Sequence, residues 1–136
     1  MESKKPCLVL VVEDTTLIEK SVEDILQRRG YVNASFQDPY RALEYLSINL
    51  DRVDLIITDT ETPGIGGIEM AKRAVAMSPH VSVILLYGQG KQQPQIATLP
   101  NIRFMIEKPA SEKDLVEAVE SVIKECGLLP ERRRYR

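Results

Sequence analysis

Charged residues follow three of the apolar runs in this sequence, and their types suit phosphate and metal chemistry. Glu13 and Asp14 come directly after the first run. Asp59 ends the third run, and Lys108 follows the last. If these runs are parallel strands, their carboxyl ends meet at the edge of the sheet where such folds bind ligands. Carboxylates gathered there repel one another, and a hard divalent cation such as Mg²⁺, which prefers oxygen ligands, relieves that repulsion.

This group of residues is suited to phosphoryl transfer. A carboxylate at the edge of a metal site can act as a nucleophile and form an aspartyl phosphate. The metal and the lysine would neutralise charge on the transferring group, so catalysis would come from placement and electrostatics. Alone, each residue has a plainer interpretation: a solvated loop start at Glu13-Asp14, a turn at Asp59, a surface charge at Lys108. The functional interpretation rests on their all falling at strand ends.

The rest of the chain supplies the elements that would position these residues. Continuous apolar runs are typical of strands covered on both faces, and apolar residues three or four apart indicate helices. The expected strands span residues 7–12, 31–36, 53–58, 81–87 and 102–106. The helical stripes are Ile18, Val22, Ile25 and Leu26; Leu43, Leu46 and Leu50; Ile68, Ala71 and Val75; and Leu115, Val119, Val122, Ile123 and Cys126.

Capping residues and helix breakers set the expected helix ends. Thr16 and Glu19 match a capping box, and Asp38-Pro39 reads as an N-cap followed by proline at the first helical position. Ser111 caps the last helix, and Ser78-Pro79 closes the third. Prolines and glycine between residues 88 and 100 allow only a short or distorted fourth helix. The glycines of the loop 63–67 are free to take positive φ.

Strand and helix alternate five times, which predicts an α/β fold with a doubly wound parallel sheet. The five strands are expected in the flavodoxin-like order 2-1-3-4-5, with helices on both faces and helix 4 short or distorted. The 136 residues fit one domain, residues 1–136, with a core of about 7–126 and a basic tail at 127–136.

Composition narrows the function classes. The net charge is -2, with 43% hydrophobic and 28% charged residues, so an ordinary globular protein that binds no nucleic acid is expected. The arginines at the end of the tail, Arg132, Arg133, Arg134 and Arg136, read as a solvated terminus or a weak contact with an anion. Cys7 and Cys126 read as small core residues, and His80 as a surface loop residue. With no signal peptide and no membrane span in view, a cytoplasmic protein without membrane partners is expected.

Taken together, the motifs resemble the receiver domain of two-component response regulators, from about Leu8 to Cys126. They are the run ending in Glu13-Asp14, the segment Asp54–Asp59 with Pro63-Gly64-Ile65-Gly66-Gly67, and Lys108-Pro109. The resemblance implies that Asp59 accepts a phosphoryl group from a histidine kinase or phosphotransfer protein. It implies no enzyme activity beyond self-catalysed phosphorylation and dephosphorylation. The implied Mg²⁺ site, in which Mn²⁺ could substitute, consists of Glu13, Asp14, Asp59 and the backbone carbonyl of Glu61; Lys108, Tyr87 and Gly88 would line the phosphoryl pocket.

Two positions depart from the family pattern. The family usually has Ser or Thr at the end of strand 4, where this sequence has Tyr87 before Gly88. It also favours Tyr or Phe three positions before the lysine, where this sequence has Met105 beside Phe104. Both residues of the family's usual switch are therefore altered. Phosphorylation is expected to couple weakly to the face formed by the helix expected between residues 88 and 100 and the strand at 102–106.

Three other functions are compatible with parts of this sequence. A haloacid dehalogenase-type phosphatase is disfavoured, because Asp59-Thr60-Glu61-Thr62 lacks an aspartate at its second position and leaves Glu13-Asp14 unexplained. A flavin-binding protein of the same fold is disfavoured, because two acids after the first strand repel a phosphate unless a metal lies between. A pseudo-receiver that binds proteins independently of phosphorylation stays open because of Tyr87.

Overall fold

A computed structural model describes residues 6–13, 16–62, 64–88, 90, 99–126 and 129–130, with side chains for 8–13, 20–62, 64–88, 90 and 99–125. Its parallel strands lie in the order β2-β1-β3-β4-β5, which confirms the predicted fold class and strand order. The bounds are β1 (Pro6–Val12), β2 (Val32–Phe36), β3 (Val53–Asp59), β4 (Ser82–Tyr87) and β5 (Ile102–Glu107).

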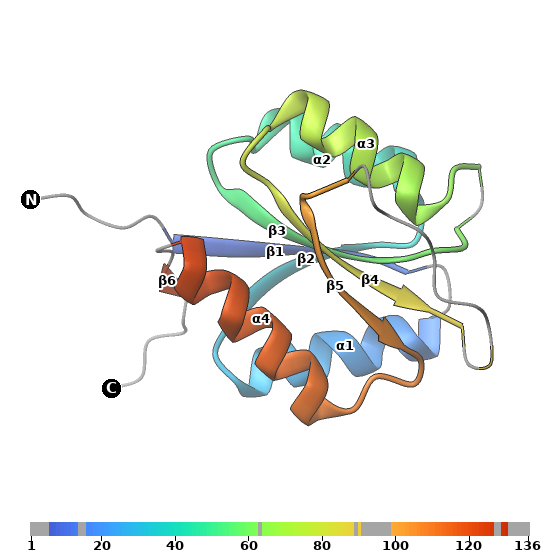
Figure 1. The fold of residues 1–136 in the computed structure, drawn as a ribbon, viewed down its shortest axis with the longest axis vertical. Coiled ribbons are helices and arrows are strands. Elements are labelled where there is room, and N and C mark those ends of the chain that lie inside the picture. The colour runs from blue at the N-terminus through green and yellow to red at the C-terminus, as the bar shows by residue number, and fades with distance from the viewer. Residues whose placement is uncertain are drawn as a thin grey trace, which may run out of the picture.

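Helices cover both faces of this sheet (Figure 1). They are α1 (Thr16–Arg28), α2 (Pro39–Ile48), α3 (Gly67–Met77) and α4 (Glu112–Cys126). α2 and α3 lie together on one face, and α1 and α4 lie on the other (Figure 1). The short or distorted helix expected between residues 88 and 100 falls mostly on residues 89 and 91–98, outside the described residues.

Two hydrophobic cores, one on each face, explain why the strand runs do not alternate with polar residues. β3 is buried along its whole length. Leu55 and Ile57 face the core under α1 and α4, whereas Val53 and Ile56 face the core under α2 and α3. Because both faces of the strand are covered, both sets of side chains must be apolar.

The expected helix ends are largely confirmed. The Asp38 side chain accepts a hydrogen bond from the Tyr40 amide at 2.9 Å, with Pro39 in the first turn. Ser111 Oγ accepts from the Asp114 amide at 3.0 Å, and α3 ends at Met77 with Ser78 as its C-cap. α1 begins at Thr16, although the Thr16 and Glu19 side chains lie outside the described ones, as do those of Cys7 and Cys126.

Two expectations about local structure were wrong, and one strand was not foreseen. The buried face of α3 is Gly67, Met70, Ala71 and Ala74, while Ile68 and Val75 are only partly buried. Leu50 lies beyond the end of α2 and is exposed, and Ala42 takes a buried place on that helix instead. The segment after α4 contains a two-residue strand, β6 (Leu129–Pro130), which pairs with the start of β1.

Candidate functional site

Glu13, Asp59 and Lys108 meet at the carboxyl end of the sheet. Lys108 Nζ lies 3.0 Å from Asp59 Oδ2 and 3.6 Å from Glu13 Oε2. The side chains of Glu13, Asp59 and Lys108 are 1%, 5% and 16% exposed. Two carboxylates and an ammonium group are thus brought together, almost out of solvent, from three separate parts of the chain. Asp14, the fourth residue of the expected group, lies outside the described residues.

The register of the sheet explains how the three residues meet. Val12 of β1 is paired with Thr58 of β3, so Glu13 and Asp59 both follow that pair on adjacent strands. β4 lies between β3 and β5, so Lys108 starts about two strand spacings, roughly 10 Å, from β3. The Lys108 amide donates to the carbonyl of Tyr87 at 2.7 Å, which fixes its backbone beside β4. A long side chain is needed to cross the remaining distance, and lysine has one.

Asp59 and Glu13 stabilise the protonated form of Lys108. Partial burial lowers the pKa of Lys108, but the hydrogen bond to Asp59 and the negative charges of Glu13 and Asp59 outweigh it. The pKa of Lys108 is therefore raised above the usual value for lysine, and the side chain stays protonated at physiological pH. The arrangement keeps one fixed positive charge beside the carboxylate of Asp59.

The glycine-rich loop brings α3 close to Asp59. The Gly67 amide donates to the Thr60 carbonyl at 3.0 Å, and a Cβ atom on Gly67 would overlap the carbonyl oxygen of Asp59. A Cβ atom on Gly66 would lie 2.8 Å from the Thr60 carbonyl oxygen. Only Gly64 of the three has positive φ, at +88°. Gly66 and Gly67 are therefore required for close approach, not for the positive φ that the sequence suggested.

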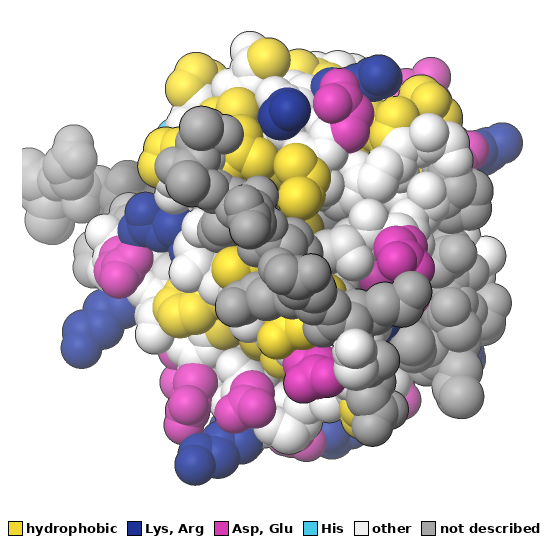
Figure 2. Space-filling model, turned by 45° about the vertical axis from the view of Figure 1, so that its right-hand side comes forward, with side chains coloured by type: hydrophobic (Ala, Val, Ile, Leu, Met, Phe, Trp, Pro, Cys, Tyr) yellow, Lys and Arg dark blue, Asp and Glu magenta, His cyan; other side chains and the backbone are white. Residues whose placement is uncertain are grey.

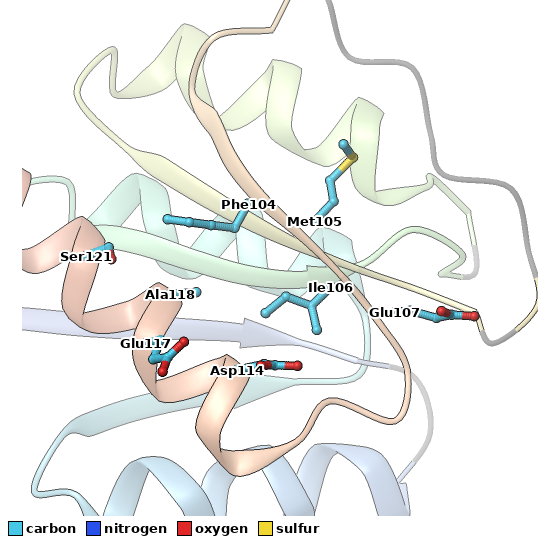
Figure 3. A pocket seen from close by; sticks show the side chains of 8 residues that line it. All are labelled: Phe104, Met105, Ile106, Glu107, Asp114, Glu117, Ala118 and Ser121. Atoms are coloured by element: carbon cyan, nitrogen blue, oxygen red, sulfur yellow. The ribbon is translucent and has the colours of Figure 1, made fainter.

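The two atypical residues take different positions. Tyr87 is half-buried at the end of β4, and among the described residues its hydroxyl forms no hydrogen bond with Asp59 or Lys108. Gly88, the next residue, is also half-buried. Met105 points from β5 toward the α3 side of the sheet, whereas Phe104 points toward α4 (Figure 3). Met105 and Phe104 therefore pack against different cores.

The oxygen atoms at this site suit a hard divalent cation. Glu13 and Asp59 supply buried carboxylates, the ligand type that Mg²⁺ prefers. No group of three or more His, Cys, Asp or Glu side chains able to hold a metal occurs within the described part of the chain. The expected set needs Asp14 as its third carboxylate, and that residue is not described. The two described carboxylates fit such a cation.

A second acidic residue of β3 has a partner that the sequence did not indicate. Asp54 Oδ1 lies 2.5 Å from His80 Nε2, with the Asp54 side chain 3% and that of His80 49% exposed. Ser78 Oγ lies 3.2 Å from His80 Nδ1. His80 is on the surface as expected, but it also contacts a buried carboxylate near the start of β3. The only signal in the sequence was an acidic residue inside an apolar run, with no indication of its partner.

Replacing His80 with alanine is expected to destabilise the fold by about 1–3 kcal/mol, because a buried carboxylate loses a hydrogen-bond donor. Urea unfolding at neutral pH measures the change. The variant His80→Gln keeps a side-chain N–H donor and should retain more of the stability. Equal losses in both variants would show that the contact with Asp54 contributes nothing.

Comparison with known proteins agrees with this geometry. The model of the response regulator receiver domain matches residues 9–120. The chain is 28% identical over 121 residues to the chemotaxis protein CheY of Treponema pallidum, covering 88% of this chain and 84% of that protein. It is 25% identical over 129 residues to the C4-dicarboxylate transport transcriptional regulatory protein DctD of Rhizobium meliloti, covering 94% of this chain and 28% of that protein.

Solved structures give the same result. The receiver domain of the hybrid histidine kinase CckA superposes with a TM-score of 0.72 at 26% identity, covering 85% of this chain and 98% of that one. The chain spans only 18% to 28% of the length of three longer relatives. Among the described residues, no helix combines the length and the apolar character needed to cross a membrane. The chain belongs to the response regulator receiver domain family of two-component signalling.

Proposed function

We infer that this receiver domain accepts a phosphoryl group on Asp59 in a Mg²⁺-dependent reaction. The observation that carries the proposal is the ion pair between Asp59 Oδ2 and Lys108 Nζ, at 3.0 Å, beside the buried carboxylate of Glu13. Glu13, Asp14, Asp59 and the backbone carbonyl of Glu61 would hold the metal. Lys108 would contact the phosphoryl oxygens, and Tyr87 and Gly88 would border the pocket.

The reaction is a transfer between two nucleophiles. A carboxylate oxygen of Asp59 attacks the phosphorus, and the bond from phosphorus to the donor's histidine nitrogen breaks. Because Lys108 holds Oδ2, we assign the attack to Oδ1. The departing imidazole takes its proton from solvent. Mg²⁺, or Mn²⁺ in its place, supplies positive charge to the phosphoryl oxygens when bound. Lys108 adds a second positive charge at a position fixed by Asp59 and Glu13.

The phosphodonor would be a histidine kinase or a phosphotransfer protein. This chain would be located in the cytoplasm. An apolar recess of about 260 Å³ beside Lys108 offers a docking place for the donor's helix. Val22 and Ile25 of α1 line the recess together with Pro109 and Ala110. A donor helix seated there would bring its histidine close to Asp59 while covering apolar surface. Proteins would therefore be the partners, rather than nucleic acid or membrane.

Incubation with a small phosphodonor such as acetyl phosphate tests the proposal. We expect the intact protein to gain the mass of one phosphoryl group in the presence of Mg²⁺, and to gain none when EDTA removes the metal. The variant Asp59→Asn should gain none in either condition. Asp51→Asn, which changes an exposed aspartate, is the matched control and should behave like the parent protein.

Two outcomes of this experiment would contradict phosphorylation of Asp59. A mass gain that survives in Asp59→Asn would place the phosphoryl group on another residue. No gain in the parent protein, with either the small donor or a phosphorylated phosphotransfer protein, would support the pseudo-receiver. In that case the chain would bind its partners independently of phosphorylation.

A further inference from the structure

A groove between β5 and α4 is separate from the proposed phosphorylation site. It encloses about 510 Å³, and neither Asp59 nor Lys108 lines it. Phe104 and Ile106 of β5 point toward α4 and form an apolar floor with Ala118 (Figure 3). The groove lies open on the surface of the molecule, so it can take a segment of peptide.

The walls of this groove are acidic. Glu107, Asp114 and Glu117 line it, and all three side chains are exposed. Asp114 and Glu117 lie one turn apart on the same face of α4 (Figure 3). Within the described part of the chain, neither forms an ion pair with lysine or arginine, whereas Glu112 is paired with Arg28. Glu107 accepts one hydrogen bond, from the Gly90 amide at 2.7 Å.

The surface view agrees with this description. Acidic side chains gather over the lower part of the face in view, below several hydrophobic side chains (Figure 2). A ligand that fits should therefore combine several positive charges with a flat apolar group. Arginine binds carboxylates through two parallel hydrogen bonds, and tyrosine buries a ring while keeping its hydroxyl in water.

The chain carries such a segment after Pro130. Residues 131–136 read Glu-Arg-Arg-Arg-Tyr-Arg, with four arginines and one tyrosine. We propose that residues 131–136 of this chain bind in the β5–α4 groove of the same molecule. The arginines contact Asp114 and Glu117, and Tyr135 covers the apolar floor. The proposal does not depend on phosphorylation of Asp59.

The position of β6 makes the contact reachable. β6 lies beside the C-terminal end of α4 (Figure 1). Six extended residues span about 20 Å, and Glu117 lies about 14 Å along α4 from its end at Cys126. Arg103, near that end, is paired with Glu125, so its charge is balanced and does not repel the incoming arginines.

Amide NMR spectra of the 136-residue chain test the contact. Neutralising all four arginines of residues 131–136 to alanine should shift the signals of Ile106, Ala118 and Ser121. The double reversal Asp114→Lys with Glu117→Lys should shift the same signals. Reversing the four arginines to glutamate in that double variant should restore the contact, because the charges are complementary again. Glu120→Lys, on α4 but outside the groove, is the matched control and should leave the signal of Ile106 on β5 in place.

A peptide adds a quantitative measurement. We add a peptide with the sequence of residues 131–136 to the variant in which the four arginines are replaced by alanine. The peptide should shift the amide signals of the residues that line the groove. The double reversal should weaken its binding about fivefold or more, as expected for two exposed ion pairs. The proposal is overturned if replacing the arginines leaves the amide signals of the groove unchanged. It is also overturned if Glu120→Lys lowers the affinity for the peptide as much as the double reversal does. Groove signals that change on dilution would place the segment on another copy and overturn the intramolecular contact.

Discussion

Replacing Lys108 with methionine is expected to slow phosphorylation of Asp59 by about a hundredfold or more. Removing one preorganised positive or hydrogen-bonding group from a site of charge transfer costs rate on this order. Methionine keeps most of the length of the side chain, so the loss reports the ammonium charge that lies 3.0 Å from Asp59. Rates with acetyl phosphate at saturating Mg²⁺, measured by mass spectrometry, give the comparison.

The same substitution should also lower the free energy of unfolding by about 2–4 kcal/mol, because Glu13 and Asp59 are left buried side by side without their shared cation. Added Mg²⁺ should recover part of this loss, since it replaces the missing positive charge. Lys113→Met, at an exposed position on α4, is the control and should change neither quantity. If Lys108→Met phosphorylates at the parental rate, Lys108 has no role in the transfer.

Replacing Gly67 with alanine should destabilise the protein by about 3 kcal/mol, the cost of forcing a methyl group into a space that does not admit it. In most helices this change is stabilising, because alanine is the better helix former by about 1 kcal/mol. Here the new Cβ atom would overlap the carbonyl oxygen of Asp59 and lie 3.1 Å from Leu85 Cδ2. The nearest atoms belong to the backbone of Asp59 and cannot move aside as a flexible side chain could. The start of α3 or the end of β3 must therefore shift.

Two measurements distinguish a displacement of Asp59 from a general loss of stability in Gly67→Ala. Urea unfolding gives the stability, and the rate of phosphorylation shows whether Asp59 has moved relative to Lys108. Gly66→Ala contacts only the Thr60 carbonyl oxygen, at 2.8 Å, and should cost less. A stabilised Gly67→Ala variant would mean that α3 yields easily at this point, and that the close approach to Asp59 is unimportant.

The fold and the main site could be predicted because each apolar run stops where its charged residues begin. Glu13 follows β1 directly and Asp59 is the last residue of β3, so the strand order alone places them side by side. Lys108 follows the same logic two strands away. These predictions needed only periodicity, residue type and the rule that parallel strands share an edge.

Contacts between segments without a shared pattern could not be predicted. His80 lies in a loop, and nothing in the sequence connects it with Asp54, which resembles any polar residue near the start of a strand. The face of α3 was misassigned because the predicted stripe of Ile68, Ala71 and Val75 left out Met70 and Ala74, which are buried. Where Gly67 comes close to Asp59, the helix faces the sheet with Met70 and Ala74 beside Ala71, the one residue of the predicted stripe that is buried. Such outcomes depend on distances that residue type does not encode.

The burial of β3 has a mechanical consequence for signalling. Asp59 ends a strand that is flanked by β1 and β4 and covered on both faces, so its backbone belongs to the most rigid part of the molecule. Residues 55–57 should exchange their amide protons only when the whole domain unfolds. A change at the Asp59 carboxylate therefore cannot be absorbed by the strand that carries it. If the proposed phosphorylation takes place, its effect should therefore be seen outside β3 rather than in the strand itself.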